Sequence, residues 1–166
     1  IEMWKKFLLG IDLGTSGCKI TIFDFEGNII GSWTRGYRTY YPQDGYVEQN
    51  AEDWWDVICE GLSVLLRESK IKSKEIAAIG IAGTSWACIP VDADGRVLRP
   101  AMLWFDRRSQ RQADLMKEKV GEDRLIKLSG NPVDPAYLTS KMLWIKENEP
   151  QIYIKTQKFL QSNSYI

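Results

Sequence analysis

The stretch GIDLGTSGCKITIFDFEG, residues 10–27, decides the fold, because a four-residue turn joins two apolar segments within it. Residues 6–13 and residues 18–25 each have the composition of a β-strand, and residues 14–17 connect them. A second turn then leads into a third expected strand, residues 29–37. The sequence therefore predicts an antiparallel meander of three strands.

A helix and further strands are expected after the meander. Residues 51–69 carry apolar side chains at helical spacing, and residues 76–82 form a nearly continuous apolar run, as in a strand that is covered on both faces. The remaining expected elements are a strand at residues 87–91, helices at residues 108–120, 122–128 and 138–146, and a strand at residues 159–160. This order predicts an α/β protein with a mixed sheet flanked by helices.

The composition argues against several classes of partner. Lys and Arg total 22, as do Asp and Glu, so no long-range field would draw the chain to nucleic acid or to a membrane. No apolar run approaches the roughly 20 residues that a membrane span requires. Cys18, Cys59 and Cys88 are odd in number and lack a Cys-x-x-Cys pair, which argues against a disulfide framework and a zinc site. We therefore expect a cytoplasmic protein with neither nucleic acid nor membrane as a partner.

The sequence contains no histidine. This excludes Ser/His/Asp triads, Cys/His pairs, histidine general bases and histidine metal ligands within the chain. Chemistry carried by these residues must use carboxylates, hydroxyls, backbone amides or a hard cation.

The turn between the first two expected strands has residues suited to phosphate. Its two glycines would let the backbone approach a ligand, and Thr15 and Ser16 add hydroxyl groups. Asp12 could hold Mg²⁺ directly or through its waters, and Lys19 could add positive charge. The alternative is an ordinary hairpin turn with a solvated aspartate. The pattern is neither a Walker loop nor a dinucleotide fingerprint, and the residues alone leave both interpretations open.

The chain also resembles a known family. Four segments are similar, in order and spacing, to the amino-terminal domain of the FGGY carbohydrate kinases, and among these to the xylulokinase branch: GIDLGTSGCK, YVEQNAEDWWDVI, IAAIGIAGTSWACIPVDADGRVLRPAMLWFDRRS and SKMLWIKENEPQIY. The resemblance covers residues 7–166. It implies the ribonuclease H-like ATPase fold of actin, Hsp70 and the sugar kinases. It also implies transfer of the terminal phosphate of ATP to a hydroxyl of a sugar or polyol.

The resemblance gives the turn a role in binding ATP. It places Asp12 at the Mg²⁺ and ATP position, and Gly14, Thr15, Ser16 and Lys19 in the phosphate loop. ATP and Mg²⁺ are therefore the expected cofactors.

The resemblance also implies contacts with the sugar after the expected strand at residues 76–82. Thr84, Ser85 and Trp86 fall where the family contacts its substrate. This suits the chemistry, because sugar sites combine polar groups with an aromatic face that covers C–H surface. The alternative is that Trp86 is a core aromatic side chain at a strand end.

A second group of expected sugar contacts lies in the segment WFDRR. Trp104 is the best candidate for a ring packed against the substrate, and Asp106 and Arg107 are expected to shape the polar rim. The alternative is that Asp106 forms an ion pair with a nearby arginine, Arg107 or Arg108, and only braces the loop.

Four further residues in the family segments are interpreted as structural. Trp54 and Trp55 lie on the helix expected at residues 51–69, and both side chains are expected in the protein core. Lys141 and Trp144 are expected to be packing and helix-surface residues rather than ligands.

Departures from the family pattern limit the choice of substrate. Glycerol kinases carry an Arg-Glu pair where this chain has Ser85 and Trp86, and their substrate-facing tyrosine falls on Ala136, beside Tyr137, so glycerol is disfavoured. The xylulokinases place Gln-Met-His at residues 84–86, so xylulose itself is in doubt. A ketopentose such as xylulose is the first choice, and ribulose and erythritol stay open. Two other classes also stay open, a non-kinase ATPase of the actin and Hsp70 type and an interaction domain that has lost its nucleotide.

The resemblance places two parts of the family's active site beyond this sequence. The aspartate that acts as general base is expected after Ile166, and the adenine pocket is expected in a carboxy-terminal domain. Residues 1–166 are thus expected to form an incomplete amino-terminal domain, which binds sugar and phosphate, of a two-domain kinase, with no catalytic base of its own. The expected partner is a small-molecule sugar, and a homodimer is left open.

Overall fold

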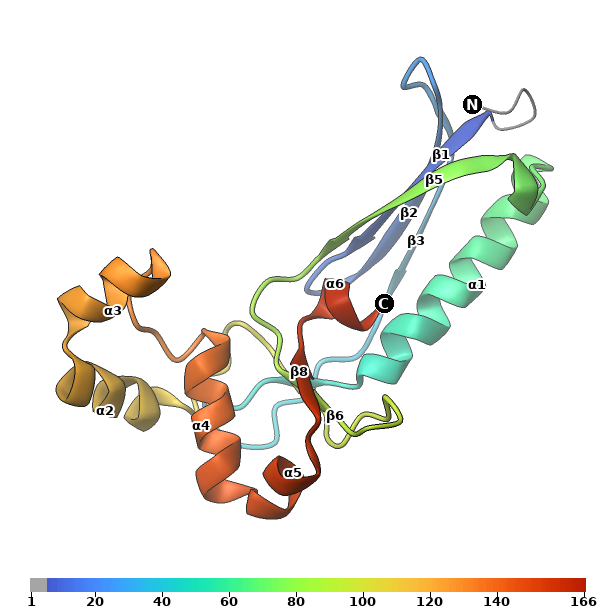
Figure 1. Ribbon diagram of the computed structural model, residues 1–166. Helices are drawn as coiled ribbons and strands as arrows, with labels where there is room; N and C mark the ends of the chain where they lie inside the picture. Colours follow the sequence, from blue (N-terminus) through green and yellow to red (C-terminus); the bar gives the residue numbers. More distant parts are fainter. Residues whose placement is uncertain (1–5) are drawn as a thin grey trace. The chain divides into compact units, whose positions relative to one another are not determined.

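The computed structural model describes residues 6–166, which form two compact units. Of the described residues, the first unit comprises 6–38, 52–84 and 166, and the second comprises 39–51 and 85–165. Figure 1 shows the sheet and the long helix of the first unit and the shorter helices of the second.

The first unit is built on a four-stranded mixed sheet. Strands β1 (Phe7–Leu13), β2 (Gly17–Asp24) and β3 (Ile29–Gly36) form the predicted antiparallel meander. Strand β5 (Ile76–Gly83) pairs with β1 in parallel, which gives the sheet order β3-β2-β1-β5. The connection from β3 to β5 contains helix α1 (Ala51–Ser69), with the bounds expected from the sequence, and a short 3₁₀ helix, Ser73–Glu75.

The core of the first unit lies between the sheet and α1, which runs along one face of the sheet (Figure 1). Gly61 allows this close approach, because an added Cβ would lie 2.3 Å from a ring carbon of Trp33. The fully or nearly fully buried apolar side chains are Leu9, Ile11, Leu13, Cys18, Ile20, Ile22, Trp54, Val57, Ile58 and Leu65.

Two expectations for the first unit are wrong. Trp54 is buried as predicted, but Trp55 is 50% exposed, because neighbouring residues on a helix point about 100° apart and only one of them can face the sheet. Strand β5 is not covered on both faces in the described residues, since Ile79 and Ile81 are exposed. It lies at the edge of the sheet with β1 as its one neighbour there.

The second unit consists of short strands and helices. Strand β4 (Glu48–Gln49) pairs with β7 (Ala101–Met102), and β6 (Ile89–Val91) pairs with β8 (Lys158–Leu160). The helices are α2 (Gln110–Val120), α3 (Glu122–Ser129), α4 (Leu138–Asn148), α5 (Pro150–Lys155) and α6 (Ser162–Tyr165). Helices α2 to α4 were predicted, whereas α5, α6, β4 and β7 are too short to leave a clear pattern.

A separate core forms in the second unit. Cys88, Met102 and Ile145 are fully buried in it, and side chains from α4, α5 and β8 pack around them. All three cysteines of the chain are free thiols, as expected, and burial raises the pKa of Cys18 to about 11. Across residues 6–166, none of the helices is both long enough and apolar enough to cross a membrane.

Candidate functional site

The turn between β1 and β2 is closed by a backbone hydrogen bond from Gly14 N to Gly17 O at 3.0 Å. Gly17 is required here by the neighbouring strand, because an added Cβ would lie 2.6 Å from the carbonyl oxygen of Arg35. Neither glycine has a positive φ angle. The glycine at position 17 thus has a structural reason that is independent of any ligand.

Two side chains hold this turn from outside. The hydroxyl of Tyr37 donates a hydrogen bond to Gly14 O, and burial raises the Tyr37 pKa, so that the phenol keeps its proton. Thr15 Oγ1 lies 3.3 Å from Thr84 Oγ1, and Thr84 N donates to Leu13 O at 2.8 Å. The structure therefore places Thr84, a predicted sugar contact, against the predicted phosphate turn, whereas Ser85 and Trp86 belong to the second unit.

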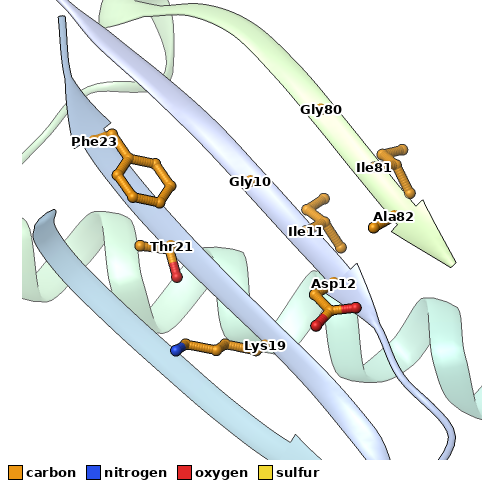
Figure 2. A pocket seen from close by; sticks show the side chains of 9 residues that line it. All are labelled: Gly10, Ile11, Asp12, Lys19, Thr21, Phe23, Gly80, Ile81 and Ala82. Carbon is orange, nitrogen blue, oxygen red and sulfur yellow. The ribbon is translucent and has the colours of Figure 1, made fainter. Parts of the chain in front are cut away.

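A hollow of ≈ 440 Å³ lies on the face of the sheet beside this turn. Figure 2 shows its lining side chains on three neighbouring strands, with the Lys19 amine pointing away from the Asp12 carboxylate. The β1–β2 register sets Asp12 opposite Lys19, and both are exposed. Gly10 pairs with Gly80 in the β1–β5 register, so neighbouring positions on two strands lack a side chain. Because these two glycines lie side by side, backbone atoms form part of the floor of the hollow.

The donors around Asp12 fit a magnesium ion that is bound together with phosphates. The residues that the structure describes contain no group of three or more His, Cys, Asp or Glu side chains placed to hold a metal by themselves. Mg²⁺ usually keeps several waters and takes one or two carboxylates along with substrate phosphate oxygens. One exposed carboxylate next to an open hollow suits that mode. The assignments of Asp12, Gly14, Thr15, Ser16 and Lys19 stay predictions.

Trp86 lies in an unusual backbone conformation. Its φ angle is 58°, a left-handed value that is rare for a bulky residue. Its amide donates to Gln161 Oε1 at 3.2 Å, and its ring meets the Tyr137 ring edge-on with centroids 4.7 Å apart. The residue remains 38% exposed and, with Tyr137, lines a hollow of ≈ 400 Å³. The other walls of the hollow come from α2, α3, residues 131–133 and the start of α4. Trp86 is thus not a core residue within this unit.

Trp104 is also partly exposed, at 42%. Its ring meets Phe105 with centroids 5.1 Å apart, and the preceding residue, Leu103, is fully buried. Trp104 does not line the hollow beside Trp86. The ring is partly exposed and follows a buried residue, and its contact with sugar stays a prediction.

The contacts of Asp106 match the alternative in which this residue pairs with an arginine and braces the loop. Its side chain is fully buried and accepts hydrogen bonds from Val47 N at 2.7 Å and from Arg108 through both Nε and Nη2. Arg108 also pairs with Glu48 at 2.7 Å, and its guanidinium lies 3.8 Å from the centroid of the Tyr46 ring. The Asp106 carboxylate is therefore engaged by protein groups in this structure.

Arg107 points to the surface. Its Nη1 donates to Asp134 Oδ1 at 2.8 Å, and both side chains are well exposed. An exposed pair of this kind contributes little to stability, about 0–1 kcal/mol. Arg107 can therefore leave Asp134 for a ligand at small cost.

Lys141 was expected, together with Trp144, to be a packing or helix-surface residue rather than a ligand. It is fully buried, and its ammonium donates to Trp86 O at 2.7 Å and to Leu103 O at 2.6 Å. Burial lowers its pKa to about 8. No local pattern reveals these contacts, because the two partners lie 55 and 38 residues away along the chain.

Comparisons with known proteins identify the family of this chain. The family model for the N-terminal domain of the FGGY family of carbohydrate kinases matches residues 7–166. A xylulose kinase from Bacillus subtilis (strain 168) is 37% identical over 161 residues, which cover 97% of this chain and 32% of that protein. A glycerol kinase from Thermococcus gammatolerans is 33% identical over 155 residues, covering 93% of this chain and 31% of that protein.

A solved structure has a similar fold. The crystal structure of a xyloylose kinase from Brucella ovis matches with a TM-score of 0.89 at 31% identity, covering 96% of this chain and 33% of that one. The fold is thus the actin, Hsp70 and sugar kinase ATPase fold, as the sequence predicted. The chain spans about a third of the length of the curated relatives it matches. It belongs to the FGGY family of carbohydrate kinases and corresponds to the family's N-terminal domain.

Proposed function

We propose that the protein containing this chain transfers the terminal phosphate of ATP to a hydroxyl of a sugar, and that residues 7–166 belong to its sugar- and phosphate-binding domain. Family membership supports the reaction class. The single structural observation that carries the proposal is Trp86, a partly exposed tryptophan held in a left-handed backbone conformation beside an open hollow. Backbone strain of this kind clusters at active sites and ligand-binding sites.

The turn after β1 is the proposed phosphate side. Asp12 would hold a magnesium ion, which would offset the negative charge of the phosphates. Thr15, Ser16 and the amides of the turn would donate hydrogen bonds to the phosphates, and Lys19 would add positive charge. Tyr37 keeps the turn in place through Gly14 O, so these donors are fixed before ATP arrives.

The segments around Trp86 and Trp104 are the proposed sugar side. Aromatic rings cover the C–H surface of a sugar, while hydroxyl and charged groups orient its O–H groups. Ser85 and Arg107 are the exposed polar candidates, whereas the buried carboxylate of Asp106 would act by shaping the loop. The general base that accepts the proton of the sugar hydroxyl is proposed to come from outside residues 1–166.

A ketopentose such as xylulose is the proposed substrate. The proteins with which the chain shares 37% and 31% identity are described as a xylulose kinase and a xyloylose kinase. The second candidate is glycerol, favoured by the 33% identical glycerol kinase. The side chains at Ser85 and Trp86 favour the sugar, because they replace the charged Arg-Glu pair of the glycerol kinases with a small hydroxyl and a ring.

The direct test measures ATP consumption by the full-length protein with a panel of acceptors: D-xylulose, D-ribulose, erythritol, glycerol and D-gluconate. We expect the highest kcat/KM with a ketopentose and at least a tenfold lower value with glycerol. ATP hydrolysis that no acceptor stimulates would contradict the proposal and favour a non-kinase ATPase of the same fold.

A further inference from the structure

Two tryptophan segments, residues 84–90 with Trp86 and residues 101–107 with Trp104, lie side by side at one point in the second unit. Cys88 and Met102 form an isolated antiparallel bridge, with backbone hydrogen bonds of 2.9 and 3.1 Å in the two directions. Beyond this bridge, no further ladder pairing joins the segments in the described residues. Trp86 precedes the bridge on one segment, and Trp104 follows it on the other.

The buried ammonium of Lys141 links the two segments next to the backbone bridge. Lys141 Nζ donates to the carbonyl oxygens of both Trp86 and Leu103, at 2.7 and 2.6 Å. Its side chain is fully buried and extends from α4, whose residue Ile145 lies in the core of this unit. One charged group anchored in the core therefore holds a backbone atom of each tryptophan-bearing segment.

The backbone at Trp86 needs such a restraint. A left-handed conformation costs a non-glycine residue about 1 kcal/mol or more, so it persists only where contacts on both sides enforce it. Gln161 Oε1 accepts from the amide of Trp86, and Lys141 donates to its carbonyl. Hydrogen bonds to a charged donor are stronger than those between neutral groups.

We propose that Lys141 is a positioning residue for the sugar side: by holding the carbonyls of Trp86 and Leu103, it fixes the two tryptophan-bearing segments relative to each other. Lys141 does not touch the sugar in this role. The inference rests on the proposed function, because only a protein that binds a sugar needs the two rings held in position. It assigns a purpose to a buried charge that packing alone does not require.

The test replaces Lys141 in the full-length protein. Lys141→Met keeps the length and apolar stem of the side chain but removes both hydrogen bonds, and Lys141→Gln keeps a shorter neutral donor. Lys155→Met, on the exposed end of α5, is the matched control. Each variant is compared with the wild type for KM and kcat with D-xylulose and ATP, and for amide hydrogen exchange in peptides that span residues 84–90 and 101–107.

We expect faster exchange in both peptides of Lys141→Met and little change elsewhere in the protein. We also expect a KM for D-xylulose that rises about tenfold or more, a KM for ATP within about twofold, and a smaller change in Lys141→Gln, since small misplacements of binding groups cost large factors in rate. The control variant should match the wild type in every measurement.

Hydrogen exchange and KM together distinguish a failure of the positioning role from a failure of the proposed function. Faster exchange in both peptides together with an unchanged KM for D-xylulose would overturn the positioning role while leaving the proposed function intact. Unchanged exchange, or exchange that rises throughout the protein, would also overturn it, as would failure of both variants to fold, because Lys141 would then be a general stability element. A wild type that phosphorylates none of the acceptors would overturn the proposed function, and the sugar role of Lys141 with it.

Discussion

The turn after β1 and the segments around Trp86 and Trp104 fix their candidate binding groups by different means. In the turn, strand pairing holds the candidate groups in place. The register sets Asp12 opposite Lys19, and Gly17 is in close contact with the backbone of β3. In the described residues, the two tryptophan segments pair with each other through one isolated backbone bridge. Buried charged side chains complete their connection to the rest of the unit.

This difference predicts different responses to substitution. A site fixed by strand register keeps its geometry when one functional side chain is removed, so the loss appears in catalysis alone. A site fixed by buried ions depends on residues that never touch the ligand. Removing such a residue leaves a partner charge or carbonyl unsatisfied, which lowers stability and displaces the binding groups together.

The largest expected effect is on stability in the second unit. Asp106→Ala removes the buried partner of Arg108 and the acceptor of Val47 N, which we expect to lower the free energy of unfolding by about 3–5 kcal/mol. Urea unfolding measures this effect, with the exposed Glu118→Ala as the control. A variant as stable as the wild type, with a raised KM for sugar, would instead make Asp106 a substrate contact.

The largest expected effect on catalysis is in the turn. Asp12→Ala in the full-length protein should lower kcat about 10²- to 10³-fold, because a preorganised charge is lost from the metal and phosphates. Its melting temperature and its KM for sugar should stay near the wild-type values, since Asp12 is exposed. Glu26→Ala, in the exposed turn after β2, is the control. Equal turnover at saturating ATP and Mg²⁺ would remove Asp12 from the mechanism.

The pH dependence of stability tests the buried charge of Lys141. Burial lowers its pKa to about 8 from 10.5; Cys88, Asp106 and Asp134 act against this shift, and Arg108 acts with it. Between pH 8 and 10.5 the unfolded chain binds more protons at this site, so folding becomes relatively more favourable as pH rises. The stability of the wild type relative to Lys141→Met should rise through this window by up to about 3 kcal/mol. Urea unfolding at pH 7 and pH 10 measures this, and a constant difference would contradict it.

The smallest expected effect concerns the exposed ring of Trp104. Trp104→Ala should melt within a few degrees of the wild type but raise the KM for sugar about tenfold, which corresponds to roughly 1–2 kcal/mol of lost contact. Trp55→Ala is a matched control, because Trp55 is similarly exposed on α1. Should Trp104→Ala unfold, or keep the wild-type KM, the ring is structural.

The sequence predicted the parts of the molecule that repeat a local pattern. The meander, α1 and β5 follow from alternation, helical spacing and turn residues, and so does the position of Asp12 at the end of β1. Strands β4 and β7 have two residues each and exist because of their pairing with each other, which no local pattern reveals. The same holds for Lys141, since its partners lie 55 and 38 residues away along the chain.

Tertiary neighbours explain one wrong expectation and add a structural role to one glycine. Trp54 and Trp55 have the same side chain, and only the helix phase relative to the sheet decides which of them is buried. The glycine at position 17 was expected to let the backbone approach a ligand. The carbonyl of Arg35 in β3 also excludes a side chain there, and the ligand role stays a prediction.

We propose that the turn after β1 serves the phosphates and that the tryptophan segments serve the sugar. Isothermal titration of D-xylulose into the wild type, Asp12→Ala and Trp104→Ala, each as the full-length protein without ATP, separates the two roles. We predict a Kd for Asp12→Ala within about twofold of the wild type and a Kd for Trp104→Ala about tenfold higher. Weakened binding in Asp12→Ala with unchanged binding in Trp104→Ala would contradict the claim, as would a wild type that does not bind the sugar.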